Sequence, residues 1–124
     1  MSPAAQSRRT SEPRPDVPLS CFRLDPAGGP ARLVLVGELD LATAPLAREA
    51  IGHAQRETRE LILDLGDVWL VDLSGLRVLL DAAVRARRTG RPLTIANCPP
   101  LVPRMLHLLG LSGALDIQSD VRAA

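Results

Sequence analysis

The chain contains no lysine and no tyrosine, and Phe22 and Trp69 are its only phenylalanine and tryptophan. A surface that binds nucleic acid usually offers clustered cations and aromatic rings on which bases can stack. Here 15 basic residues are balanced by 14 acidic ones, which leaves a formal net charge of +1. Because both the positive field and the aromatic rings are missing, we expect no nucleic-acid partner.

Cysteine and histidine are also scarce. Cys21 and Cys98 form no CxxC pair, and neither His53 nor His107 has the spacing of a metal ligand around it. Isolated cysteines of this kind are typical of a reducing cytosol, where they pack as small apolar side chains. No apolar run is long enough to span a membrane, and the N-terminus lacks the apolar stretch of a signal peptide. We expect a cytoplasmic protein with no cofactor, no metal and no membrane insertion.

Motifs for nucleotide binding and hydrolysis are missing as well. The glycines of "GGP" precede a proline and a strand-like stretch, whereas a phosphate-binding loop continues into G-K-[ST] and a helix. The stretch "DLSGL" around Ser74 is not the G-x-S-x-G elbow of a hydrolase. A phosphoryl-accepting receiver domain is an alternative, with Asp64 or Asp72 as acceptor. Such a domain needs an acidic pair for magnesium and a lysine beyond the acceptor, and this chain has no lysine.

The length of 124 residues fits one domain preceded by a tail. Residues 1–18 are rich in proline, serine and arginine and offer almost no apolar side chain, which predicts a disordered tail. Within it, "RRTS" is similar to a basophilic-kinase site at Ser11, although such short matches are frequent by chance. The folded domain is predicted over residues 19–124.

Strand-like and helix-like patterns alternate through this domain. Short apolar stretches predict strands at 19–24, 31–39, 61–65, 92–97 and 114–117. Helical spacing and end signals predict helices at 43–57, 72–90 and 101–110. Gly66 and Asp67 are expected to turn the chain after the third strand. Strands interleaved with helices predict an α/β domain in which helices pack against a mixed β-sheet.

The residues at the start of the helix at 72–90 can cap the helix or hold a phosphate group. Asp72 is well suited to be the N-cap, because its carboxylate can accept from the free amides of Ser74 or Gly75 and complements the helix dipole. The same unpaired amides also favour a phosphate group at this point. These residues therefore permit phosphorylation of Ser74 without requiring it.

Three stretches of the chain, taken in order, resemble the STAS family of small domains, named for sulphate transporters and anti-sigma-factor antagonists. They are "LVLVGELDLATAPL", "LILDLGDVWLVDLSGLRVLL" and "PLTIANCPPLVPRMLHLLGL", and the resemblance covers about residues 19 to 118. Bacterial single-domain members bind a serine-kinase anti-sigma factor and thereby release a sigma factor. The kinase switches them off by phosphorylating a serine at the start of the second helix. The resemblance implies a STAS-like fold and a protein-interaction module that is not an enzyme.

The resemblance also carries two motifs onto this chain. It places the family's "GELD" loop on Gly37, Glu38, Leu39 and Asp40, and its D-S-[ST]-G motif on Asp72, Leu73, Ser74 and Gly75. The family's phosphoacceptor serine is thus replaced by Leu73, which has no hydroxyl. We favour the interpretation that the protein binds its partner permanently. Two alternatives stay open: Ser74, about 100° further around the helix, has become the acceptor, or the protein is a scaffold or transport-complex subunit with no sigma-regulatory role.

The partner-binding surface that the resemblance implies centres on the first turns of this helix. Its members are Asp40, Asp72, Leu73, Ser74, Gly75 and Leu76, and the expected partner is a serine-kinase anti-sigma factor. Trp69 is a further candidate, because tryptophan is enriched among residues that dominate binding. Strand alternation places Trp69 opposite Val68 and Leu70, and this side chain either anchors a partner or packs under a helix. The sequence does not specify an oligomeric state.

Overall fold

The computed structural model describes residues 18–118. The predicted tail, apart from Pro18, and the kinase-like site at Ser11 therefore lie outside the described residues. The elements follow one another as β1 (Leu19–Leu24), β2 (Ala31–Leu39), α2 (Ala44–Glu57), β3 (Leu61–Val71), α3 (Leu73–Thr89), β4 (Leu93–Ala96) and α4 (Leu101–Leu108). This order is the alternation of strands and helices that the sequence predicts.

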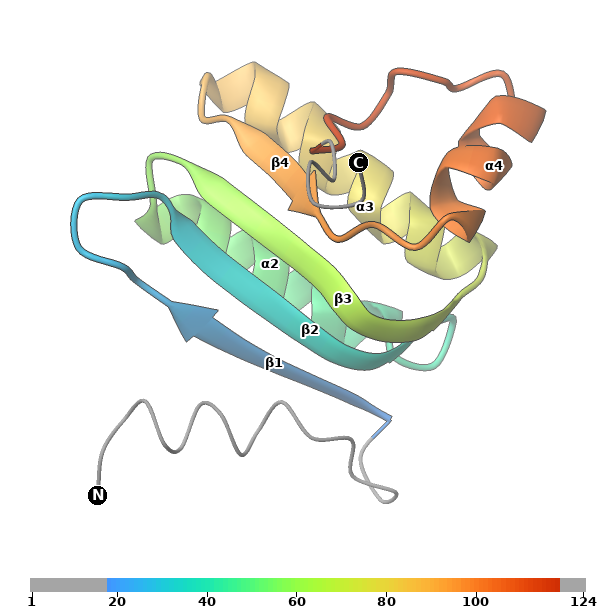
Figure 1. The fold of residues 1–124 in the computed structure, drawn as a ribbon, viewed down its shortest axis with the longest axis horizontal. Helices are drawn as coiled ribbons and strands as arrows, with labels where there is room; N and C mark the ends of the chain where they lie inside the picture. Colours follow the sequence, from blue (N-terminus) through green and yellow to red (C-terminus); the bar gives the residue numbers. More distant parts are fainter. Residues whose placement is uncertain (1–17, 119–124) are drawn as a thin grey trace, which may run out of the picture.

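The four strands form one mixed sheet in the order β1-β2-β3-β4. β1 runs antiparallel to β2, whereas β2, β3 and β4 are parallel neighbours. Parallel neighbours need a crossover connection, and α2 and α3 provide the two that this sheet requires. Figure 1 shows both helices behind the sheet, on one of its faces, with α4 at the edge of the molecule beyond β4. The expected α/β architecture is therefore confirmed.

The core lies between the sheet and the helices α2 and α3. Strand side chains alternate between the two faces of a sheet, so every second residue of β2 and β3 points toward the helices. The fully buried strand residues include Leu35, Leu39, Leu63 and Leu65, and the fully buried helix residues include Ala47, Ile51 and Leu79. This packing fixes the first turns of both helices against the sheet.

β3 is longer than predicted. Gly66 and Asp67 do not turn the chain, and the strand continues through them. Val34 of β2 pairs with Asp64, but Val36 pairs with Asp67, so one residue of β2 faces two residues of β3. This arrangement is a β-bulge, which glycine accommodates easily. A glycine and an aspartate are typical of turns, but here the pairing with β2 keeps the backbone extended.

A second irregularity of β3 falls at Trp69. Gly37 pairs with Val68 and Glu38 pairs with Leu70, which leaves Trp69 as an extra residue. The side chain of Trp69 is 55% exposed and that of Leu70 is 41% exposed. The alternation that grouped Leu70 with buried Val68 is therefore interrupted. Trp69 does not pack under a helix, and two large apolar side chains reach the surface side by side.

The C-terminal region agrees with the sequence only in part. α4 begins at its predicted start, Leu101, and ends two residues before the predicted end, with Pro103 in its first turn and Gly110 in a left-handed conformation (φ 73°) beyond its end. The predicted last strand is reduced to a single bridge between Ile95 and Ile117.

Within residues 18–118, no helix combines the length and the apolar composition needed to cross a membrane.

Candidate functional site at the start of α3

Asp72 connects three segments at the start of α3. Its Oδ1 accepts a hydrogen bond from the amide of Gly75 at 2.9 Å, which confirms the predicted N-cap. Its Oδ2 accepts from the amide of Leu41 at 3.2 Å. Its own amide donates to the carbonyl of Leu39 at 3.1 Å. Asp72 therefore ties the loop after β2 to the first turn of α3.

The loop between β2 and α2 is folded around Asp40 and Thr43. The amide of Thr43 donates to Asp40 Oδ1 at 3.0 Å, and the amide of Asp40 donates to Thr43 Oγ1 at 3.0 Å. The hydroxyl of Thr43 donates to the carbonyl of Glu38 at 2.8 Å. Thr43 occupies the predicted N-cap position of α2, but its side chain caps no free amide of that helix. The structure confirms that the loop of Asp40 lies beside the start of α3, because its next residue bonds to Asp72.

Gly75 lies where α3 passes closest to the end of β2. A Cβ atom at this position would collide with the carbonyl group of Leu39. The backbone contact explains why a glycine follows Ser74, and it leaves Gly75 buried. Leu76 is only 1% exposed. The prediction that the side chain of Leu76 contacts a partner is therefore wrong, because helical periodicity directs it into the core.

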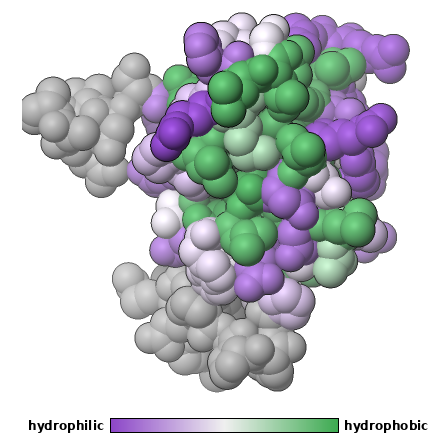
Figure 2. Space-filling model, turned by 90° about the vertical axis from the view of Figure 1, so that its right-hand side faces the viewer, coloured by the Kyte–Doolittle hydropathy of each residue, from purple (hydrophilic) through white to green (hydrophobic). Residues whose placement is uncertain are grey.

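Large apolar side chains remain exposed around this helix start. We call the group the apolar rim, and it consists of Leu41, Trp69, Leu70 and Leu73. Leu73, the first residue of α3, is 63% exposed and Leu41 is 75% exposed. Figure 2 shows apolar side chains gathered over the end of the molecule that carries α4, the end that faces right in Figure 1. An exposed apolar group of this kind is typical of a protein-interaction site.

A groove of about 460 Å³ lies between the first turns of α2 and α3, next to the apolar rim. Its lining residues are Leu41, Ala44, Pro45, Arg48, Ser74, Arg77 and Asp81. Arg48 and Asp81 form an ion pair from one helix to the other. The sequence alone does not indicate Leu41, Arg48 or Arg77 as site residues. Arg77 follows Ser74 by three residues, so helical spacing was an available signal, whereas no local pattern connects Arg48 to this helix.

Asp64, one alternative acceptor for a receiver-like domain, is already engaged. Its Oδ2 pairs with Arg32 at 2.7 Å, and its Oδ1 accepts from the Asn97 side chain at 3.1 Å and from the amide of Gly66 at 2.9 Å. Among residues 18–118, no three His, Cys, Asp or Glu side chains are grouped so that they could hold a metal ion. The surroundings of Asp64 therefore give the receiver interpretation no support.

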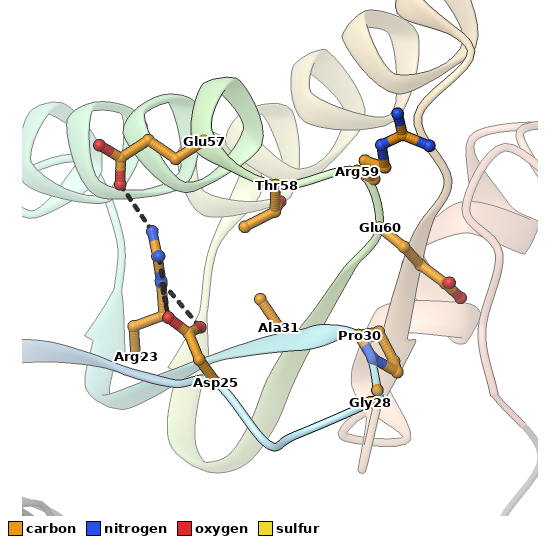
Figure 3. A pocket seen from close by; sticks show the side chains of 10 residues that line it. Arg23, Asp25, Gly28, Pro30, Ala31, Glu57, Thr58, Arg59 and Glu60 are labelled. Carbon is orange, nitrogen blue, oxygen red and sulfur yellow. Dashed lines mark hydrogen bonds and ion pairs between the residues drawn. The ribbon is translucent and has the colours of Figure 1, made fainter.

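A second cavity, of about 400 Å³, lies at the opposite end of the sheet. Figure 3 shows Arg23 of β1 between Asp25 and Glu57. Nη2 of Arg23 lies 2.9 Å from Oδ2 of Asp25, and Nη1 lies 2.8 Å from Oε1 of Glu57. The hydrogen bonds from Arg23 to Asp25 and Glu57 raise the pKa of this guanidinium. These charges are already paired with each other, and the pair of Arg23 with Glu57 joins β1 to the end of α2.

The two cysteines are free and half-buried. Burial raises the pKa of Cys21 and of Cys98 to about 11. Since the thiolate is the reactive form of cysteine, neither side chain is an activated nucleophile at neutral pH.

Several known proteins resemble this chain in sequence. A profile of the family described as "Mlab, STAS domain" matches residues 22–119. The anti-sigma-B factor antagonist of Bacillus subtilis is 27% identical over 85 residues, which span 68% of this chain and 78% of that protein. The anti-sigma-B factor antagonist of Listeria monocytogenes is 30% identical over 88 residues, 70% of this chain and 77% of that protein.

The fold is shared with solved structures as well. The crystal structure of an anti-sigma factor antagonist from Mycobacterium paratuberculosis aligns with a TM-score of 0.71 and 23% identity, over 89% of this chain and 92% of that one. The phosphorylated form of the Bacillus cell fate determinant SpoIIAA aligns with a TM-score of 0.61 and 18% identity, over 84% and 96%. The profile and the sequence relatives together confirm the resemblance drawn from the three motifs. The chain belongs to the STAS domain family and is similar to the anti-sigma factor antagonists, which are non-enzymatic regulators.

Proposed function

We propose that this STAS domain binds a serine-kinase anti-sigma factor in the cytoplasm and thereby releases a sigma factor. The contact surface is the apolar rim together with Asp40, Asp72 and Ser74. The observation that carries the proposal is the position of Leu73. It is the first residue of α3, it follows the capping Asp72 directly, and its side chain is largely exposed. A partner that docks on the start of α3 therefore meets this leucine.

The leucine also determines how the interaction is regulated. A kinase attaches phosphate to a hydroxyl, and Leu73 has none, so the usual off switch of the family is absent at this position. Covering the exposed part of the side chain contributes about 1–2 kcal/mol to binding. We propose that the protein is a permanently active antagonist, whose activity follows its abundance and not its phosphorylation.

The experiment begins with affinity purification of the tagged chain from its native cytosol and identification of the retained proteins by mass spectrometry. The captured kinase is then incubated with the wild type, with Leu73→Ser and with Leu73→Ala, in the presence of ATP. We expect phosphorylation of Leu73→Ser and its release from the kinase. The wild type and the matched control Leu73→Ala should stay unmodified and bound.

Two results contradict parts of this proposal. If the wild type is phosphorylated as readily as Leu73→Ser, the antagonist is not permanently active. Ser74 is then the acceptor to examine with Ser74→Ala, since its hydroxyl makes no hydrogen bond within the described residues. If transporter or signalling-complex subunits are captured and no such kinase is found, the domain is a scaffold and sigma regulation is wrong.

A further inference from the structure

We infer that the groove between α2 and α3 receives an acidic side chain of a partner protein, carried on a segment whose neighbouring apolar residues contact Leu41 and Leu73. The proposed function supplies the identity of that partner, and the inference rests on it to this extent. The chemistry of the docking segment follows from the groove alone.

The polar groups of the groove are mostly donors without an acceptor. Arg77 is exposed on α3 and forms no ion pair with any residue in the described range. The Ser74 hydroxyl is likewise without a hydrogen bond there. The lining carboxylate, Asp81, is already paired with Arg48. An incoming group that accepts hydrogen bonds therefore finds at least two free donors.

The charge of the groove favours an anion. Two arginines face one aspartate, so the lining residues carry a net positive charge. The first turn of α3 adds the positive end of a helix dipole, although Asp72 already accepts from its amide at Gly75 and from the Leu41 amide. Hydrogen bonds between a guanidinium and a carboxylate are charge-assisted, and arginine presents its donors in a fork that matches two carboxylate oxygens. A glutamate or aspartate side chain satisfies Arg77 in this way.

The surroundings of the groove select a protein segment as its occupant. Leu41 lines the groove and is 75% exposed, and its amide bonds to Asp72, the residue directly before the exposed Leu73. An apolar border around an arginine anchor is the arrangement found at the centre of protein interfaces. The volume of about 460 Å³ lies within the range of pockets that hold small ligands, roughly 300–1,000 Å³. The acidic residue enters this space while its apolar neighbours cover Leu41 and Leu73.

The test uses a library of random dodecapeptides displayed on phage, selected on the wild-type domain. We expect the enriched peptides to carry Asp or Glu next to leucine, isoleucine, valine or phenylalanine. The affinity of a labelled enriched peptide, measured by fluorescence anisotropy, should fall at least tenfold in Arg77→Glu and should weaken with added salt. Arg88→Glu, which reverses an exposed charge in the last turn of the same helix, is the matched control and should bind as the wild type does. Thermal melts of both variants establish that they fold.

Several outcomes would overturn the inference. They are the absence of any enriched peptide, enrichment of peptides without acidic residues, and equal affinity for Arg77→Glu and Arg88→Glu. The selection needs no anti-sigma factor, so failure to capture a kinase removes the proposed function and leaves the groove result standing. Conversely, a captured kinase that binds Arg77→Glu as tightly as the wild type overturns the groove assignment and leaves the antagonist function intact.

Discussion

The backbone amide of Asp72 donates to the carbonyl of Leu39 at 3.1 Å, so the end of β2 holds the residue that caps α3. This bond fixes the distance between the two loops from which the proposed binding surface is built. The side chain of the same aspartate bonds to the amides of Leu41 and Gly75. One residue thus orders both halves of the surface.

Replacing Asp72 with alanine should therefore destabilise the fold by about 1–2 kcal/mol, the usual effect of losing an N-cap. Asp72→Asn keeps a side-chain oxygen as acceptor and should lose less. The measurement is the free energy of unfolding in urea. Asp67→Ala is the control, because this residue is exposed and its side chain makes no hydrogen bond in the described region. Equal losses in Asp72→Ala and Asp67→Ala would show that the cap contributes nothing.

Replacing Gly75 with alanine should also destabilise the fold, by about 1–3 kcal/mol, the range for overpacking. Alanine is the better helix former by about 1 kcal/mol, but its Cβ would collide with backbone atoms of Leu39, which cannot move aside as a side chain can. Gly29→Ala, where a Cβ meets only Pro26 at an ordinary 3.7 Å, is the control. A gain in the melting temperature of Gly75→Ala would contradict the close approach.

Alanine variants of Leu73 and Leu76 should differ in whether they weaken partner binding or the stability of the fold. Leu73→Ala removes an exposed side chain, so the free energy of unfolding should change by no more than about 0.5 kcal/mol while partner binding weakens. Leu76→Ala empties a buried position and should cost about 2–5 kcal/mol. Urea unfolding and calorimetric titration with the captured partner measure the two effects. If Leu73→Ala unfolds as easily as Leu76→Ala, Leu73 belongs to the core.

Trp69 is the only tryptophan of the chain, so its fluorescence reports on the proposed surface without a label. The free protein should emit at the long wavelengths of a solvated indole, and the emission should shift to shorter wavelengths when a partner covers the ring. Trp69→Ala should abolish binding and leave the melting temperature nearly unchanged, because the side chain is 55% exposed. A loss of several degrees would place Trp69 in the core instead.

The stability of the fold should decrease between about pH 9 and pH 11. The pKa of Cys21 and of Cys98 rises from 9.0 to about 11 on folding, so the unfolded chain releases these protons first as the pH rises. Stabilisation is complete below pH 9 and is lost as the pH passes through 11. The chain has no lysine and no tyrosine to titrate in this range. Unfolding in urea at several pH values should show the slope in the wild type and a flatter profile in a Cys21→Ala, Cys98→Ala double variant.

The sequence predicted best what neighbouring residues determine among themselves. Asp72 caps α3 because its own side chain reaches an amide three residues on. Gly90 ends the same helix in a left-handed conformation with φ 68°, and its amide donates to the carbonyl of Ala86. The order of the three stretches also indicated the family correctly, because each is one continuous piece of the sequence.

The features that the sequence did not predict depend on strands or helices far apart in the chain. Gly66 and Asp67 read as a turn, and only the register with β2 shows that they continue a strand. Trp69 interrupts the alternation of buried and exposed residues, and again only the register with β2 shows that it is an extra residue. Arg48 of α2 and Arg77 of α3 line the same groove, and this placement depends on how the two helices pack. Spacing along one helix cannot show it.

The two bulges of β3 let this strand hold more residues than β2 over the same length of sheet. From Val34 to Leu39, β2 advances five residues, while β3 advances seven between the paired residues Asp64 and Val71. Each bulge places two residues of β3 beside one residue of β2, so an extra residue is exposed while the later pairs keep their register. Deleting Trp69 would therefore restore regular pairing, leave Val71 opposite Leu39 and remove one apolar side chain from the surface. The second bulge thus enlarges the apolar rim without moving the start of α3.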